Sequence, residues 1–317
     1  MRYALMTEPQ QGLSYDEILA AARTAEESGL EAFFRSDHYA SFPGESGMPT
    51  TDAWATLAGL ARETDRIRLG VLVSPVTFRI PGSLAKVIQT VDEMSNGRVE
   101  AGFGAGWNDE EHAQLGIGFP PLGERYDMLA EELAIIHGLW TEDDGWSFEG
   151  DHWRVRSAMR HGQVARNGRR HPHIILGGKG MPRLADLVAR YADEFNLNSA
   201  SPDDALPAYG RVRDACRAIG RDPDELVYSA MTGVLVAETD GDLRTRVADL
   251  LEALGQTGAD GDAWLAARRG RWIMGTPDEA HERVAALARQ GTQRIMLQDF
   301  VPCDLDHIRL MGRVFRD

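Results

Sequence analysis

Short apolar runs alternate along most of the chain with longer segments whose apolar residues recur at helical spacing. The clearest example begins at residues 69–73, an apolar run too short for a helix and rich in β-branched residues, which predicts a buried strand. Residues 81–94 place apolar side chains three and four positions apart, which predicts an amphipathic helix. Residues 99–104 predict a second strand. A strand, a helix and a strand in this order favour a parallel pair joined by a right-handed crossover.

The remaining chain continues this alternation, so that each predicted strand is followed by a helix. The strands are predicted at residues 3–6, 32–34, 69–73, 99–104, 173–176, 194–198, 226–236 and 294–297, and the helices at 14–29, 52–63, 81–94, 124–139, 180–191, 203–219, 240–254, 262–269, 277–290 and 305–314. Eight such units are the signature of a closed (β/α)8 barrel, or TIM barrel, in the α/β class. An open doubly wound sheet is the alternative, but the first strand–helix turn lacks the glycine fingerprint of a dinucleotide site.

We expect a single barrel domain over residues 1–317. An insertion is predicted at about 141–171, because this stretch has poor periodicity and many charges, and a small hairpin is predicted within it at 146–155. Residues 39–50 and 108–123 are predicted to be loops, because both are rich in glycine and proline.

Composition restricts the partners and the compartment. The formal net charge of −15 argues against a nucleic-acid or anionic membrane surface. No run approaches the roughly 18 consecutive apolar residues of a membrane span, and the N-terminus lacks the apolar region of a signal peptide. Cys216 and Cys303 lie far apart and are expected to be free thiols. We therefore expect a cytoplasmic protein that acts on a small molecule.

Candidate chemistry follows the predicted strand ends, because barrels of this class place their active sites at the carboxyl ends of the strands. His38 lies just past the second strand beside Asp37, whose carboxylate is a candidate to orient the ring and tune its pKa. The alternative is a histidine that is hydrogen-bonded within a loop. Gly177, Gly178, Lys179 and Gly180 join a strand to a helix N-terminus, where free N–H groups bind phosphate, and Lys179 adds a cation. The alternative is a plain tight turn.

Two further strand ends and a pair of aromatic residues also supply candidates. Ser74-Pro75 ends the third strand with a bulge, a cis bond or simple termination. The small residues Gly104, Ala105 and Gly106 let a flat ring approach the fourth strand. The aromatic residues Phe42 and Trp107 are candidates to wall a ring pocket, with an aromatic core as the alternative.

Two sets of charged or titratable residues remain. Arg125 begins a long helix near the predicted active face and is a candidate to meet an anion in the substrate pocket, although a solvated pair with Glu124 is the alternative. His171 and His173 resemble a metal-binding pair, but they fall at the start of a strand, on the face opposite the predicted site. We therefore predict no metal site.

These segments together resemble the bacterial luciferase-like monooxygenase superfamily, and within it the branch of deazaflavin (coenzyme F420)-dependent oxidoreductases. The matching segments are residues 36–38, 73–79, 95–99, 104–108, 119–126, 177–180, 191–194 and 275–279. The resemblance implies a (β/α)8 barrel with a non-prolyl cis peptide at Leu72–Val73 or Val73–Ser74, whose bulge presses on one face of the cofactor ring. It also implies a homodimer.

The resemblance assigns roles to individual residues. His38 would lie over the reactive ring carbon as the catalytic residue. The cofactor would be bound by Asp37, Leu72, Val73, Ser74, Gly104, Ala105, Gly106, Asn108, Gly177, Gly178, Lys179 and Gly180. The sugar-phosphate dehydrogenases of this branch carry a glutamate acid where this chain has Trp107, and a substrate lysine where it has Asn198 and Ser199. These departures argue against a phosphorylated sugar and against a paired acid–base scheme.

Three functions follow from these patterns. The first is an F420-dependent oxidoreductase that transfers a hydride between the deazaflavin and a small organic substrate, such as an enone, imine or alcohol, in a pocket lined by Phe42, Trp54 and Trp107. The second is an FMN-dependent monooxygenase, because the tricyclic ring is shared and because few cations other than Lys179, Arg183 and Arg125 are expected near the phosphate turn to hold an acidic tail. The third is a non-catalytic barrel that binds a ligand or partner.

Overall fold

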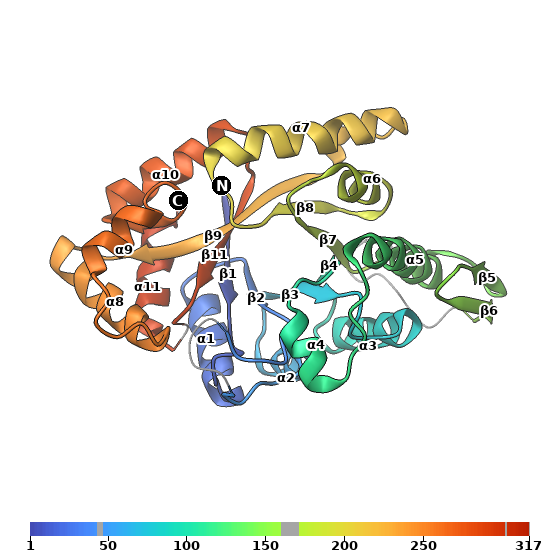
Figure 1. Cartoon of the computed structure of the whole chain (residues 1–317), viewed down its shortest axis with the longest axis horizontal. Helices are drawn as coiled ribbons and strands as arrows, with labels where there is room; N and C mark the ends of the chain where they lie inside the picture. Colours follow the sequence, from blue (N-terminus) through green and yellow to red (C-terminus); the bar gives the residue numbers. More distant parts are fainter. Residues whose placement is uncertain (43–46, 160–170, 302, 317) are drawn as a thin grey trace.

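The computed structural model describes residues 1–42, 47–159, 171–301 and 303–316. Eight parallel strands of this described part close into a barrel, which confirms the predicted (β/α)8 fold (Figure 1). In their order around the barrel they are β1 (Arg2–Thr7), β2 (Ala32–Arg35), β3 (Arg68–Pro75), β4 (Val99–Gly104), β7 (His173–Gly178), β8 (Glu194–Leu197), β9 (Val227–Val236) and β11 (Arg294–Asp299). Pairing between β8 and β9 completes the ring.

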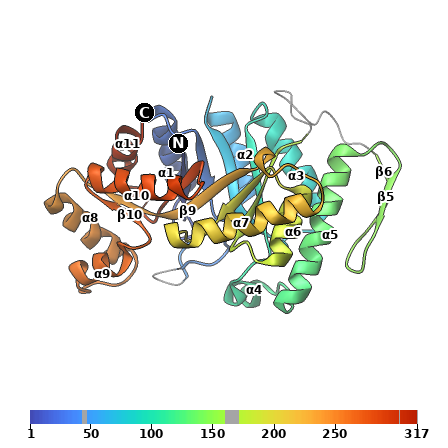
Figure 2. The same cartoon turned by 90° about the horizontal axis from the view of Figure 1, so that it is seen from above.

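Helices cover the outside of the barrel (Figures 1 and 2). They are α1 (Tyr15–Glu27), α2 (Ala53–Glu63), α3 (Pro81–Met94), α4 (Asp109–Leu115), α5 (Leu122–Thr141), α6 (Pro182–Tyr191), α7 (Pro202–Ala218), α8 (Asp240–Ala253), α9 (Gly261–Arg268), α10 (Pro277–Arg289) and α11 (Leu305–Val314), with a 3-10 turn at Pro223–Glu225. No helix among the described residues is both long and apolar enough to span a bilayer.

Alternation along the strands separates two apolar layers. One face of each strand packs against the helices in the larger core, whereas the other face fills the barrel interior. The interior cluster comprises Ala4, Met6, Ala32, Phe34, Leu72, Ile175 and Met296. Because both faces are buried, the strands read as continuous apolar runs, and for this reason they were predictable from the sequence.

The predicted helix signals also hold locally. The Ser14 hydroxyl accepts a hydrogen bond from the Glu17 backbone N–H, and the Glu17 carboxylate accepts one from the Ser14 N–H, forming a capping box. Pro81 occupies the first turn of α3, and Asn96 and Gly97 have positive φ angles of 60° and 84° just past its end.

Two elements correct the sequence predictions. Helix α4 lies inside the segment predicted to be a loop at 108–123. It is capped at its start by Asn108, whose side chain accepts a hydrogen bond from the Glu110 N–H, and at its end by the left-handed Gly116. Its buried residues, Glu111 and His112, are polar, so no apolar periodicity revealed it. Strand β10 (Ile273–Gly275) was also not predicted, because it is only three residues long; it pairs in parallel with the last residues of β9.

The predicted insertion carries the hairpin. Strands β5 (Trp146–Glu149) and β6 (Arg154–Ala158) pair antiparallel, so the hairpin is confirmed, although it ends three residues later than predicted. It projects at the end of the molecule opposite α8 and α9 (Figures 1 and 2). The rest of the insertion, residues 160–170, lies outside the described residues.

Buried charges close the amino-terminal end of the barrel. Arg294 on β11 donates to Glu100 on β4 at 2.6 Å and to Glu194 on β8 at 3.0 Å. His173 lies in the same cluster, with its Nε2 3.0 Å from a Glu194 carboxylate oxygen. His173, which together with His171 resembles a metal-binding pair in the sequence, therefore belongs to an ionic cluster at the end of the barrel opposite the predicted site.

Candidate active site

The strand registers bring the predicted site residues to one rim. Arg35 on β2 pairs with Val71 on β3, Pro75 pairs with Gly104 on β4, and Gly177 on β7 pairs with Asn196 on β8. All these strands are parallel, so the residues that follow each of them emerge at the carboxyl end of the barrel. The turn at residues 177–180 and His38 thus lie at the same end, as the sequence analysis requires.

The end of β3 forms a bulge against glycines. The Leu72–Val73 peptide is cis, which agrees with the first of the two bonds that the family resemblance suggested, and the pairing of β3 with β4 shifts register between Val71 and Ser74. A Cβ at Gly104 would lie 2.7 Å from a Val73 methyl carbon, and one at Gly177 would lie 2.9 Å from another. The Val73 side chain therefore packs closely against Gly104 on β4 and Gly177 on β7, and a larger residue at either position would force it to shift. We call Val73 and these two glycines the glycine cradle.

A buried glutamate orients His38. The Nδ1 atom of His38 lies 2.9 Å from Oε1 of Glu111, whose side chain is 2% exposed, and the Tyr39 N–H donates to the other carboxylate oxygen at 3.0 Å. The sequence-based prediction that Asp37 orients the ring is therefore wrong. A carboxylate can only accept hydrogen bonds, so Nδ1 carries the proton and Nε2 is the nitrogen available to a substrate.

Asp37 instead joins two loops. Its carboxylate accepts hydrogen bonds from the Ser74 hydroxyl at 2.9 Å and from two nitrogens of Arg79. Arg79 also donates to Asp52. Burial alone would lower the pKa of Arg79, but Asp37 and Asp52 beside it raise that pKa above its ordinary value. Asp37 thus fixes the ends of β2 and β3 from beneath the rim.

The predicted aromatic wall assembles around His38. The His38 ring meets Phe42 edge-on with centroids 4.4 Å apart and Trp107 with centroids 5.7 Å apart. Phe42 and Trp107 are themselves 5.0 Å apart, and Trp107 is 64% exposed. Trp54 does not join them, because it is buried and its Nε1–H donates to the Ser74 hydroxyl at 2.9 Å.

Arg125 supports the loop after β4. It is only 7% exposed, so the interpretation as a solvated pair with Glu124 is wrong. Its Nε–H donates to the Ala105 carbonyl at 3.0 Å, and its guanidinium lies 3.8 Å above the Phe119 ring. Because its donors are directed at the backbone of residues 105 and 120, it shapes the segment that carries Gly104 to Asn108.

The turn at residues 177–180 is surrounded by cations. The Lys179 ammonium donates to the Asn198 carbonyl at 2.6 Å, and burial lowers its pKa. Arg211 on α7 donates to the carbonyls of Gly180 at 2.7 Å and Lys179 at 3.0 Å. Arg271, which follows α9, donates to the Ser199 carbonyl at 3.0 Å. The sequence analysis missed Arg211 and Arg271, because they are far from the turn in the chain.

Helix α6 adds a second feature to this turn. It begins at Pro182, directly after the turn, and the residue before it, Met181, makes no side-chain capping bond. The first-turn N–H groups are therefore open to an anion, and the helix dipole favours negative charge at this position.

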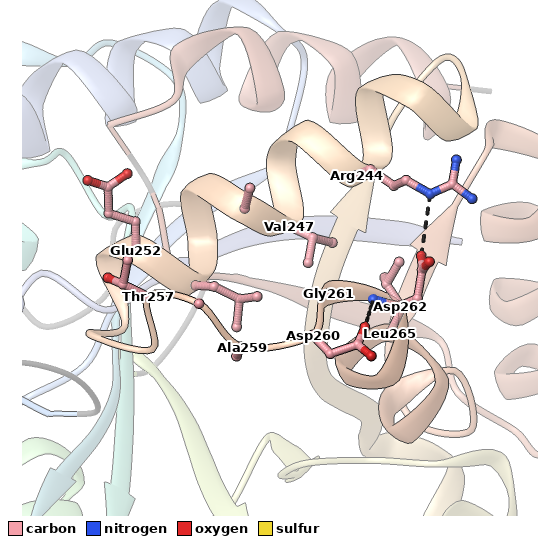
Figure 3. A pocket seen from close by; sticks show the side chains of 12 residues that line it. Arg244, Val247, Glu252, Thr257, Ala259, Asp260, Gly261, Asp262 and Leu265 are labelled. Carbon is pink, nitrogen blue, oxygen red and sulfur yellow. Dashed lines mark hydrogen bonds and ion pairs between the residues drawn. The ribbon is translucent and has the colours of Figure 1, made fainter.

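A cavity elsewhere does not compete for the role of active site. A space of about 430 Å³ lies between α8 and α9, away from the strand ends (Figure 3). Arg244 on its rim pairs with Asp262 at 3.3 Å, and Asp260 caps α9 through the Asp262 and Ala263 N–H groups. Because these polar groups satisfy one another, they do not converge on a ligand.

Comparison with known proteins agrees with this geometry. Residues 1–294 match the family model described as luciferase-like monooxygenase. An F420-dependent glucose-6-phosphate dehydrogenase from Nakamurella multipartita is 33% identical over 217 residues, which are 66% of this chain and 60% of that protein. An uncharacterized protein from Mycobacterium tuberculosis is 31% identical over 245 residues, which are 68% of this chain and 83% of that protein.

Solved structures share the fold over almost the whole chain. An F420-dependent secondary alcohol dehydrogenase, solved with an F420–acetone adduct, superposes with a TM-score of 0.80 at 20% identity and covers 100% of this chain and 99% of its own. The monooxygenase RslO1 from Streptomyces bottropensis superposes with a TM-score of 0.81 at 24% identity and covers 99% of this chain and 98% of its own. At these identities the likeness shows the barrel alone.

Proposed function

The chain belongs to the luciferase-like monooxygenase family of oxidoreductases, and from that premise we propose that it binds coenzyme F420 and transfers a hydride between the deazaflavin and a small organic substrate. The single observation that carries this proposal is the rim itself, where a glycine cradle, an oriented histidine and a cation-ringed phosphate turn lie together. The F420-dependent relative from Nakamurella multipartita supports the choice of cofactor.

The residues present fit a flat, acidic cofactor. Gly104 and Gly177 let the Val73 side chain pack close to β4 and β7, so the bulge at Leu72–Val73 can support one face of a tricyclic ring. The open N–H groups at the start of α6 suit its phosphate, and Lys179 supplies charge. When bound, the deazaflavin supplies a carbon that gives or accepts a hydride, and the protein contributes orientation and exclusion of water.

The structure places more positive charge near the turn at residues 177–180 than the sequence alone indicates. An F420 tail carries several carboxylates beyond the phosphate, and binding it requires more cations than Lys179 and Arg183. Arg211 and Arg271 now stand beside the same turn. Arg183 is paired with Asp127, so the cations beside the turn are Lys179, Arg211 and Arg271, of which Arg271 also pairs with Asp204 at 3.3 Å. These three favour the longer acidic cofactor over FMN, which ends in a single phosphate.

His38 is the residue that we assign to the substrate. Its Nε2 faces no described protein partner, and Glu111 holds the opposite nitrogen. The ring can therefore hold or move a proton at the substrate atom next to the reacting carbon. Phe42 and Trp107 pack on its edge and exclude water from that side.

Ultrafiltration of the purified apo-protein with F420 and, separately, with FMN tests the proposal. We expect F420 to be retained at micromolar concentration. We expect Arg271→Gln to weaken F420 retention by about fivefold, because one exposed ion pair with the acidic tail is lost, and to have a smaller effect on FMN, which has no such tail. Retention of FMN alone, with substrate-dependent oxygen uptake, would instead establish the monooxygenase alternative.

A further inference from the structure

Glu8 lies at the mouth of the barrel, on the same rim as His38. Ala4 and Met6 of β1 point into the barrel, so the two-residue period of the strand places Glu8 directly above them. Gln298 confirms the position, because it is paired with Met6 across β1 and β11 and donates its amide N–H to Glu8 Oε1 at 2.6 Å. Glu8 is 6% exposed.

The side-chain amide of Gln10 connects Glu8 to Phe42 of the aromatic wall. Oε2 of Glu8 accepts a hydrogen bond from the Gln10 side-chain amide at 3.0 Å. The same Gln10 nitrogen donates to the Phe42 carbonyl at 3.1 Å, and the Ser36 hydroxyl donates to the Gln10 side-chain oxygen at 2.6 Å. Glu8 is therefore held in one orientation beside the residue that packs on His38.

The charge of Glu8 has no counterpart in the described part of the chain. Its two donors are neutral amides, and it forms no ion pair with any described residue. By contrast, Asp37 is paired with Arg79, and Glu100 with Arg294. Charges that are almost fully buried are normally paired, because desolvation is costly. A fixed carboxylate without a cation at the mouth of a site is therefore suited to a cation that arrives with the ligand.

The rest of the rim reinforces this preference. The ring faces of Phe42 and Trp107 attract cations through their quadrupoles, and Trp107 is the more exposed of the two. Lys179 and Arg271 lie across the mouth, bonded to the carbonyls that follow β8, where they suit the acidic cofactor. The rim thus has a cationic side and an anionic, aromatic side.

We propose that Glu8 binds the positively charged nitrogen of the substrate and restricts the substrate class to organic cations, namely an iminium ion for reduction or a protonated amine for oxidation. The redox step rests on the proposed function. Reduction of an iminium adds one hydride with its electron pair to the carbon, and the C=N π pair becomes the nitrogen lone pair. The hydride comes from the reduced deazaflavin, and the proton released from that cofactor is taken up by the product amine, so no further reagent is needed.

Calorimetric titration of the full chain with benzylammonium and with benzyl alcohol, a neutral molecule of the same shape, tests the assignment. We expect wild type to bind benzylammonium at least about tenfold more tightly. Glu8→Gln should abolish this preference while F420 affinity stays within twofold. Glu110→Gln is the matched control, because it removes the same charge from an exposed residue of α4 and should leave the preference intact.

The outcomes separate the two proposals. Equal binding of the two probes by wild type, or an unchanged preference in Glu8→Gln, would overturn the role of Glu8. Failure of wild type to bind F420 would overturn the proposed function, whereas the charge preference would still decide the role of Glu8. If Glu8→Gln does not fold, Glu8→Asp should keep the preference with lower affinity for benzylammonium, and unchanged affinity there would count against the proposal.

Discussion

Replacing Glu111 with glutamine perturbs the orientation of His38 with almost no change in volume. The wild-type carboxylate accepts from His38 Nδ1–H at 2.9 Å and from the Tyr39 N–H at 3.0 Å. A glutamine amide replaces one accepting oxygen by a donating nitrogen, so in either orientation an N–H group faces the His38 Nδ1–H or the Tyr39 N–H. Either a donor faces a donor, or the His38 proton moves to Nε2, which then can no longer accept a proton from the substrate.

The geometry sets the size of the effect. A hydrogen bond to a charged group contributes about 1.5–3 kcal/mol in a buried setting. If that energy orients the ring in the transition state, then Glu111→Gln should lower kcat by roughly 10- to 100-fold, since 1.36 kcal/mol corresponds to a factor of ten. F420 affinity should change little, because Glu111 lies behind His38 and away from the glycine cradle.

Steady-state turnover with F420 as a function of pH measures this effect. We expect the double variant with His38→Ala to be no slower than His38→Ala alone, because Glu111 acts through His38. Glu110→Gln serves as the control on the same helix. A kcat within twofold of wild type in Glu111→Gln would refute the positioning role.

Four further substitutions test the cradle, the barrel base and a buried acid. Gly104→Ala should weaken F420 binding by at least about tenfold, because the new Cβ meets the Val73 side chain at 2.7 Å, whereas Gly82→Ala, which has open space, should bind normally in the same ultrafiltration assay. Arg294→Met should lower the free energy of unfolding in urea by about 3–5 kcal/mol, because two buried carboxylates lose their cation. Burial would raise the pKa of Glu194, but Arg294 lowers it to about 2, so wild type should lose this stabilisation as the pH falls from about 4.5 towards 2, and Glu194→Gln should lose part of that acid dependence. Burial raises the pKa of Glu132 to about 8, so its contribution to stability is lost as the pH rises from about 4.5 through 8, and Glu132→Gln should be more stable than wild type at pH 8 but not at pH 4.

The fold was predictable because barrel strands are buried on both faces. Each becomes a short apolar run, and each helix between them keeps an apolar stripe and end signals such as the Ser14 capping box. The failures have the opposite cause. Helix α4 presents two polar residues, Glu111 and His112, to the protein interior, and a polar buried face has no signature in a hydrophobicity pattern.

The site was predictable only where it follows from position in the chain. The rule that ligands meet strand ends made His38 and the turn at 177–180 candidates, and the same rule applies to Glu8, which directly follows β1. Glu111, Arg211 and Arg271 come from elements that pack at the rim from elsewhere in the chain. Their placement is a property of tertiary packing, and no local spacing reports it.

The same reasoning explains why a helix as short as α4 exists. Seven residues are too few for a helix that is stable by itself in water, so its contacts must maintain it. Glu111 binds the loop after β2 through His38 and Tyr39, and His112 binds the loop after β3 through the Thr77 hydroxyl at 2.6 Å. Asp37, the residue next to His38 in sequence, binds Ser74 and Arg79 instead. The carboxylate that orients the His38 ring therefore comes from another element. Helix α4 brings that carboxylate to the ring, and the bonds that orient His38 also keep the helix folded.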